Sequence, residues 1–216
     1  MADALTLVGF KHSVYTRIVR IALIELGMTA AYVEADPFAP DPVLGTYTPL
    51  GRVPVLQHGD FTLTETAAIL RYLVRISDLN TLLPTTPRAL ARMDQVIGIV
   101  DAYAYVPWVR QVFSNGFYAP LMNEPGDPGQ VTTGLGAGAP ALHALDAIAR
   151  EGLVLDRRAL SLADVHLAPM IDYLVRVDAG ATALQNHPAL SAWWAARAQW
   201  PALRATDPFA TIPGAG

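Results

Sequence analysis

The chain has 216 residues, of which 52% are hydrophobic and 16% are charged. At this length about 70% of the unfolded surface can be buried on folding, so a core can form without disulfides or metals. A mean hydropathy of +0.30 excludes an intrinsically disordered chain. The absence of cysteine excludes a disulfide scaffold, thiolate-ligated zinc, an iron–sulfur centre and a catalytic thiol.

The net charge is −4 and the pI is near 5.7, which argues against non-specific binding to nucleic acid. No uncharged apolar run approaches the ~18 residues of a membrane-spanning helix. The first residues, Met1 to Leu5, lack the basic region of a secretion signal. We therefore expect a cytoplasmic protein with no membrane or nucleic-acid partner.

Strand and helix patterns alternate over the first eighty residues. Short apolar runs predict strands, and apolar residues at helical spacing predict helices. In chain order we expect a strand at 5–8, a helix at 14–26 ended by Gly27, a strand at 31–35, a loop at 37–42, strands at 53–57 and 61–64 joined by a tight turn, and a helix at 65–76. This order predicts a small mixed sheet with helices packed on it.

The rest of the chain shows only helical patterns. Residues 80–87 contain prolines and threonines and predict a linker, followed by helices at 88–112 (kinked at Pro107), at 141–150 (ended by Gly152), from Ser161 to about 177, and from Pro188. The Pro- and Gly-rich stretch 119–140 predicts a long loop. We therefore expect two domains, an α/β domain over 1–82 and an all-helical domain over 88–216.

The first candidate site is the segment from Lys11 to Arg17, where a strand ends and a helix begins. The Ser13 hydroxyl would lie beside free backbone N–H groups and the positive end of the helix dipole, which favours an anion. The alternative is that Ser13 simply caps the helix, and position alone favours the cap.

The second candidate is Gly51-Arg52-Val53-Pro54-Val55. If the bond between Val53 and Pro54 is cis, the backbone of Val53 can turn outward and pair with an extended peptide ligand. The alternative is an ordinary trans bond at a strand start. Because only about 5–6% of X–Pro bonds in folded proteins are cis, sequence alone favours trans.

The third candidate is Thr64-Glu65-Thr66 at the next helix start. Free N–H groups and the Thr66 hydroxyl would accept a carboxylate, and Glu65 would attract an ammonium group. Together they suit an α-amino-acid head group. The alternative is a Thr64 N-cap with Glu65 in the first turn, where its charge merely favours the helix dipole.

These motifs in this order, with the Ser161-Leu162-Ala163-Asp164 capping box, resemble the cytosolic glutathione S-transferase family over essentially the whole chain. Ser13 preceding Arg17 by four positions resembles the serine types, including the phi and theta classes. Two departures are Thr48-Pro49 in place of Asn-Pro, and Glu65-Thr66 in place of Glu-Ser. The resemblance implies a thioredoxin-like α/β N-terminal domain and an all-α C-terminal domain.

The resemblance also implies glutathione as co-substrate. Its γ-glutamyl group would bind Glu65 and Thr66, its cysteine backbone would pair with Val53 beside Pro54, and Arg52 would reach its glycine carboxylate. The catalytic residue would be Ser13, whose hydroxyl would donate to sulfur and favour thiolate over thiol. His12, Tyr15 and Thr16 are neighbouring alternatives for that role.

The thiolate would attack a small hydrophobic electrophile in a pocket that includes Tyr15, Tyr105 and Trp108. The five histidines show no metal-ligand spacing, so no metal is expected. The resemblance further implies a homodimer with a detoxification role. Two alternatives stay open: a glutathione-dependent isomerase or dehalogenase, and a non-catalytic protein that binds ligands or other proteins. The hydroxyl at Ser13 favours an enzyme.

Overall fold

The computed structural model describes residues 4–39, 42–79 and 81–211. These residues form two compact units, each of which is described by itself. Unit 1 contains the described residues up to 81 together with 205–208, and unit 2 contains 82–204 and 209–211. None of the helices in the described ranges is long and apolar enough to cross a membrane.

Unit 1 is built on a four-stranded mixed sheet in the order β2-β1-β3-β4. Strand β1 (Leu5–Gly9) pairs in parallel with β2 (Ala31–Glu34) and antiparallel with β3 (Val55–His58), and β3 pairs antiparallel with β4 (Phe61–Leu63). A parallel pair requires a crossover, which α1 (Val14–Glu25) supplies. The predicted β-α-β and β-β-α order is confirmed.

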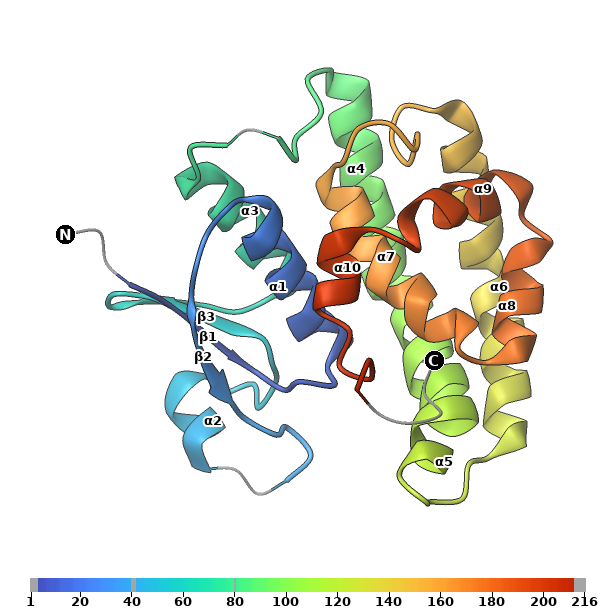
Figure 1. The fold of residues 1–216 in the computed structure, drawn as a ribbon, viewed down its shortest axis with the longest axis horizontal. Coiled ribbons are helices and arrows are strands. Elements are labelled where there is room, and N and C mark those ends of the chain that lie inside the picture. Colours follow the sequence, from blue (N-terminus) through green and yellow to red (C-terminus); the bar gives the residue numbers. More distant parts are fainter. Residues whose placement is uncertain (1–3, 40–41, 80, 212–216) are drawn as a thin grey trace. The chain divides into compact units, whose positions relative to one another are not determined.

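Helices cover both faces of this sheet. As Figure 1 shows, α1 and α3 (Thr66–Ile76) lie on one face, and α2 (Pro42–Tyr47) lies on the other. Successive strand residues point to opposite faces, so Val8 and its partner Val55 pack with Leu44 of α2. The sequence did not predict α2. Gly27 ends α1 with a φ of +62°, as predicted.

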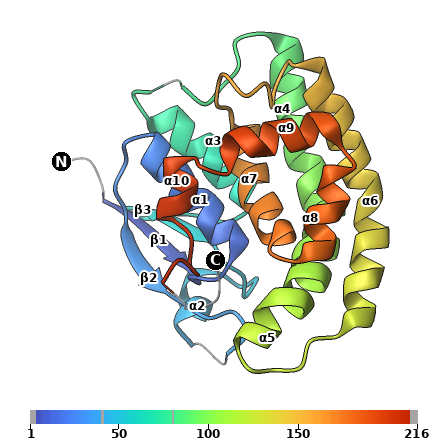
Figure 2. The same ribbon diagram turned by 45° about the vertical axis from the view of Figure 1, so that its right-hand side comes forward.

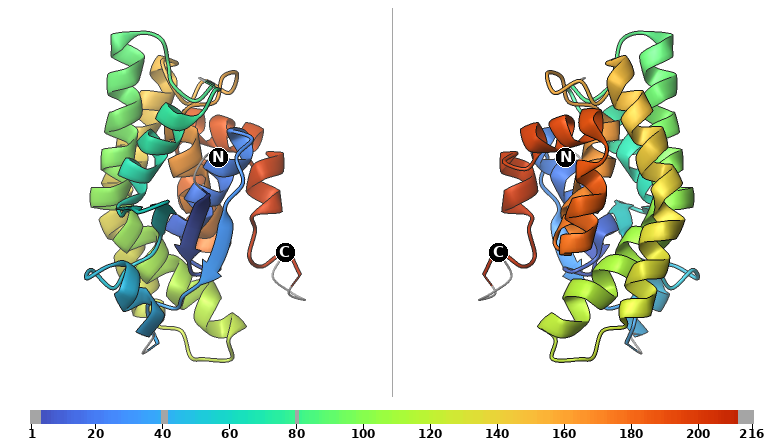
Figure 3. Two further views of the ribbon diagram at one scale, coloured as in Figure 1. Left: turned by 90° about the vertical axis from the view of Figure 1, so that its left-hand side faces the viewer. Right: turned by 90° about the vertical axis from the view of Figure 1, so that its right-hand side faces the viewer.

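Described residues of unit 2 form helices and no strand. The helix α4 (Pro87–Ile99) continues directly into the π-helical segment η1 (Val100–Tyr118), followed by α5 (Ala119–Leu121), α6 (Pro128–Glu151), α7 (Leu162–Val175), α8 (Asp178–Gln185), α9 (Pro188–Arg197) and α10 (Pro201–Ala205). Pro107 lies inside η1, and the helical conformation continues through it. Figures 2 and 3 show α6 running alongside α4 and η1.

The prediction of a long loop over 119–140 is wrong, because α6 occupies its second half. Asp127 caps this helix, accepting hydrogen bonds from Gly129 N (2.8 Å) and Gln130 N (3.2 Å). Its glycines serve close packing: a Cβ on Gly134 would stand 2.6 Å from the Pro107 carbonyl oxygen, and one on Gly138 would overlap the Trp108 indole. Glycine at these two positions therefore lets α6 approach η1.

A pair of glycine variants tests this explanation. Gly138→Ala should lower the free energy of unfolding by about 1–3 kcal/mol, since the added methyl group overpacks the contact with Trp108. A Cβ on Gly136 would have nothing within 4 Å of it, so Gly136→Ala should raise the free energy by about 0.5–1 kcal/mol through helix propensity alone. Urea denaturation measures both. Equal effects of the two substitutions would contradict the packing role.

The capping box at the start of α7 is also confirmed, and its carboxylate reaches beyond the cap. Asp164 Oδ2 accepts hydrogen bonds from Ser161 N and Ser161 Oγ, both at 2.9 Å. Asp164 Oδ1 accepts from Trp193 Nε1 (2.8 Å) and Arg197 Nε (3.0 Å) of α9. This fully buried carboxylate therefore joins α7 to α9.

Candidate functional site

The sheet topology brings the three candidate motifs of unit 1 to one end of the sheet. Because β1 and β3 are antiparallel, with Val8 opposite Val55, the loop after β1 lies beside the segment before β3. Because β4 is antiparallel to β3, with Leu63 opposite Leu56, the segment after β4 emerges at the same end. Ser13, the Val53–Pro54 pair and Glu65 therefore share this end, which we call the candidate site.

Ser13 caps α1 and still has a hydrogen to donate. Its Oγ accepts a hydrogen bond from Thr16 N at 3.3 Å, which uses an oxygen lone pair. A hydroxyl that accepts through a lone pair keeps its O–H as a donor, and no residue in the described ranges accepts it. The cap and the anion site, weighed as alternatives from the sequence, are thus compatible in one side chain.

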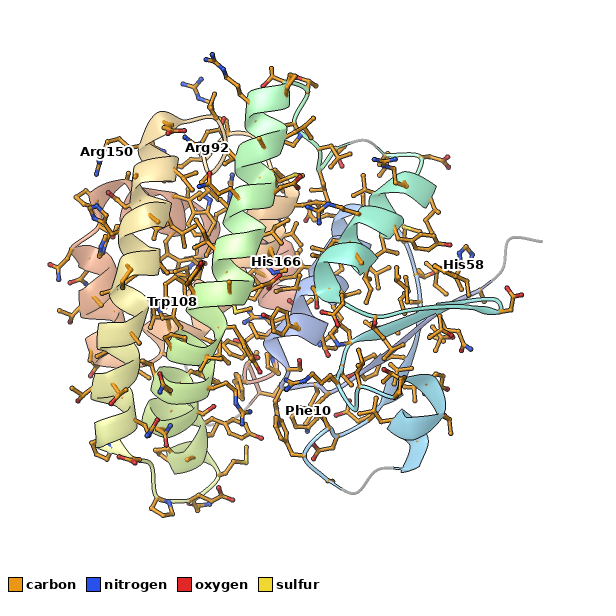
Figure 4. The ribbon with its side chains drawn as sticks, turned by 180° about the vertical axis from the view of Figure 1, so that it is seen from behind. Phe10, His58, Arg92, Trp108, Arg150 and His166 are labelled. Carbon is orange, nitrogen blue, oxygen red and sulfur yellow. The ribbon has the colours of Figure 1, made fainter. Side chains whose placement is uncertain are left out.

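The neighbours of Ser13 differ in their burial and in their contacts. Thr16 is fully buried. His12 is half-buried and meets Phe10 edge-on at 5.2 Å between ring centroids; Figure 4 labels Phe10 on the loop that follows β1. Burial, and secondarily the charge of Lys11, lowers the pKa of His12, so its ring is uncharged at neutral pH. Tyr15, in the first turn of α1, is partly exposed.

The Val53–Pro54 peptide bond is cis, contrary to the trans bond that sequence alone favours. Pro54 is buried and precedes β3, so its missing N–H removes no bond from the strand ladder. Within the part of the chain that the structure describes, the backbone of Val53 makes no hydrogen bond. Arg52 is exposed and follows Gly51, whose φ is +59°.

The N-terminus of α3 is open. Its N-cap is Glu65 rather than Thr64, and the Glu65 side chain makes no capping hydrogen bond. The first intrahelical bond runs from Ile69 N to Glu65 O at 2.9 Å, so the N–H groups of residues 66–68 have no partner inside the helix. Thr66, 7% exposed, begins the helix. Such an end accepts an anion.

The helix dipoles at the candidate site favour negative charge. The N-termini of α1 and α3 both start there, and neither helix has an acidic residue in its first turn. Lys11 and Arg52 add exposed positive charges on the flanking loops. The Glu65 carboxylate is the exposed acid at the start of α3, and it suits an ammonium group.

The backbone of Glu65 is strained, which sequence reasoning did not find. Its φ of +65° and ψ of +111° lie in a region that a residue with a Cβ rarely adopts. Such a conformation costs about 1–3 kcal/mol, and strain of this kind gathers at functional sites. A glycine would adopt this φ at a lower cost in free energy, yet the residue at this position is a glutamate.

Two substitutions at Glu65 separate strain from charge. Both Glu65→Gly and Glu65→Ala remove the carboxylate, but only glycine relieves the positive φ. We expect the glycine variant to be about 1 kcal/mol more stable than the alanine variant in urea denaturation. Equal stabilities would show that the Glu65 backbone carries no strain.

The residues predicted for the substrate pocket lie in both units. Tyr15 belongs to unit 1, whereas Tyr105 and Trp108 lie on η1 in unit 2. Tyr105 is partly buried, but Trp108 is only 1% exposed and lies between η1 and α6 (Figure 4). The Trp108 side chain therefore packs inside unit 2 and is not exposed to a ligand, contrary to the prediction that it lines a substrate pocket. Among described residues, no group of three or more histidine, aspartate or glutamate side chains is arranged to hold a metal ion.

Comparison with known proteins agrees with this geometry. The glutathione S-transferase N-terminal domain matches residues 7–81, and the C-terminal domain of the same family matches residues 151–201. Glutathione S-transferase F10 of Arabidopsis thaliana is 29% identical over 188 residues, which are 83% of this chain and 87% of that one. Glutathione S-transferase theta-1 of Bos taurus is 30% identical over 147 residues, 67% of this chain and 60% of that one.

The fold is shared with solved structures as well. The structure of glutathione S-transferase-I bound with the ligand lactoylglutathione has a TM-score of 0.78, with 24% identity over 94% of this chain and 98% of that chain. The sheet and helices of unit 1 and the helices of unit 2 therefore define a two-domain thioredoxin-like plus all-helical protein. The chain belongs to the glutathione S-transferase family, and it is an enzyme of that class that uses glutathione.

Proposed function

We propose that the candidate site binds glutathione and that the Ser13 hydroxyl stabilises its thiolate, which then attacks a small hydrophobic electrophile. The observation that supports this most is the geometry of Ser13. Its Oγ accepts from Thr16 N at the positive end of α1, and its hydrogen is left for a ligand. Ser13 activates a bound nucleophile in this scheme and forms no covalent bond.

The rest of the candidate site suits the three parts of the tripeptide. The γ-glutamyl carboxylate would accept from the first N–H groups of α3 and the Thr66 hydroxyl, and its ammonium group would pair with Glu65. The cysteine backbone would exchange hydrogen bonds with Val53, in the manner of an added strand. The glycine carboxylate would pair with Arg52. Each ligand group thus meets a complementary group of the chain.

The required stabilisation is modest. A free thiol with a pKa of about 8.5 is about 3% ionised at pH 7. A reduction of about two units makes roughly three quarters of the bound thiol ionised and corresponds to about 2.7 kcal/mol. A donated hydrogen bond and the α1 dipole both favour the charged form. The thiol proton leaves to solvent, and a sulfur lone pair forms the bond to the electrophilic carbon. In a substitution the leaving group departs with the electron pair of its bond to that carbon, and in an addition the π bond at that carbon breaks and its electron pair takes up a proton from solvent.

For the electrophile we propose a pocket to which unit 1 contributes Tyr15, whose side chain is partly exposed. We also propose that the enzyme is a homodimer with a role in detoxification, as is typical of the family. Light scattering should then give twice the 23.2 kDa mass of the chain. A mass of one chain at micromolar concentration would refute the dimer without affecting the proposed chemistry.

Replacing the proposed activator tests the mechanism. In Ser13→Ala, the thiol pKa of bound glutathione should rise toward the free value of about 8.5, because the hydrogen-bond donor is gone and only the α1 dipole remains. Conjugation of 1-chloro-2,4-dinitrobenzene at about pH 6.5 should fall by up to about 50-fold, following the lost thiolate fraction. Ultraviolet titration of the bound thiol and steady-state kinetics measure the two effects, while the glutathione Kd should change little.

Thr86→Ala is the matched control, because Ser13→Ala also removes a helix cap. Thr86 Oγ1 caps α4 by accepting from Ala89 N at 3.2 Å, so its loss should cost about 1 kcal/mol of stability, as at Ser13. Its activity should stay at the wild-type level. If Ser13→Ala kept the activity of the wild type and the same lowered thiol pKa as the wild-type complex, a neighbour such as Tyr15 would be the residue that stabilises the thiolate.

A further inference from the structure

A buried threonine, Thr16, is bonded to both ends of the loop that presents Ser13. Thr16 N donates to Ser13 Oγ at 3.3 Å, and Thr16 Oγ1 accepts from Phe10 N at 3.3 Å. The loop is closed on itself by Ser13 N, which donates to Phe10 O at 2.9 Å. One residue of α1 therefore holds the first and the last residue of the segment from Phe10 to Ser13.

The side chain of Thr16 is fixed by packing as well as by this bond. It is 0% exposed. The Thr16 methyl group packs so closely on Gly9 that a Cβ added to Gly9 would overlap it. The same Cβ would lie 2.9 Å from Thr16 Oγ1. A β-branched side chain in a helix has few accessible rotamers, so the hydroxyl has little freedom to leave Phe10 N. Glycine at the end of β1 makes this close approach possible.

We propose that Thr16 is the positioning residue for Ser13: its buried hydroxyl fixes the Phe10–Ser13 loop so that the Ser13 O–H points to the glutathione sulfur. The inference rests on the proposed function of Ser13. Thr16 cannot act on the thiol itself, because its side chain is 0% exposed and a bound ligand cannot reach its hydroxyl. A small displacement of a reacting group can lower a rate about 10²-fold, so the hydrogen bonds of Thr16 that fix this loop affect catalysis.

Two substitutions at Thr16 isolate the hydroxyl. Thr16→Val keeps the branched shape but cannot accept from Phe10 N, and Thr16→Ser keeps the acceptor but removes the methyl group beside Gly9. In Thr16→Val we expect the thiol pKa of bound glutathione to rise by about one unit, and kcat/KM to fall about fivefold at pH 6.5 but less at pH 9, where the thiol ionises unaided. Thr16→Ser should restore both values.

Thr86→Val is the matched control in unit 2, because it also removes a threonine hydroxyl that accepts a backbone N–H. It should lower the melting temperature and leave the thiol pKa unchanged. If Thr16→Val behaves in the same way, with a lower melting temperature and no change in thiol pKa, Thr16 is only structural and the inference is overturned. Should the valine variant fail to fold, Thr16→Ala is compared with Thr16→Ser by the same titration.

Ser13→Ala is titrated in parallel to distinguish two failures. A raised thiol pKa in Ser13→Ala but not in Thr16→Val overturns the positioning role alone. An unchanged thiol pKa in Ser13→Ala overturns the proposed function and, with it, the role of Thr16. A raised pKa in both variants, with rescue by Thr16→Ser, supports the inference.

Discussion

The N–H groups that begin a helix have no partner inside it, and burying them without an acceptor costs free energy. In unit 2, buried carboxylates meet this constraint at the starts of α7 and α9. Asp164 closes the start of α7 and also binds Trp193 and Arg197, while Asp146 of α6 accepts from the first N–H groups of α9, Ala189 N at 2.8 Å among them. Removing one partner of a buried ion pair typically costs about 3–5 kcal/mol. These caps therefore hold the helices of unit 2 together.

In unit 1 the helices that start at the candidate site meet the same constraint only in part. Ser13 caps α1 with one oxygen, and α3 begins at Glu65 with no side-chain cap. The N–H groups of residues 66–68 have no partner inside α3, and they lie at the end of the sheet where both helices begin. A ligand with carboxylates can therefore complete the caps that the chain leaves open.

Local patterns predicted much of the fold because they depend on near neighbours. The strands, the crossover helix, the Gly27 and Gly152 helix ends and the capping box at Ser161 all follow from such patterns. The 119–140 loop prediction failed because glycine weakens a helix locally, whereas Gly134 and Gly138 are needed for contact with η1. The cis bond at Val53–Pro54 and the strained backbone of Glu65 likewise have no local sequence signal.

By itself the sequence determined which chemical groups are present and in what order: a serine at a strand-to-helix junction, a Val-Pro pair, and a Glu-Thr pair at a helix start. Their resemblance to one family followed from that order. Only the tertiary structure decided that these groups share one end of a sheet, and that the buried Thr16 bonds to both Ser13 and Phe10. The reason is physical: strand direction and register set which distant residues meet, and the close contact of Thr16 with Gly9 arises only when β1 and α1 pack together.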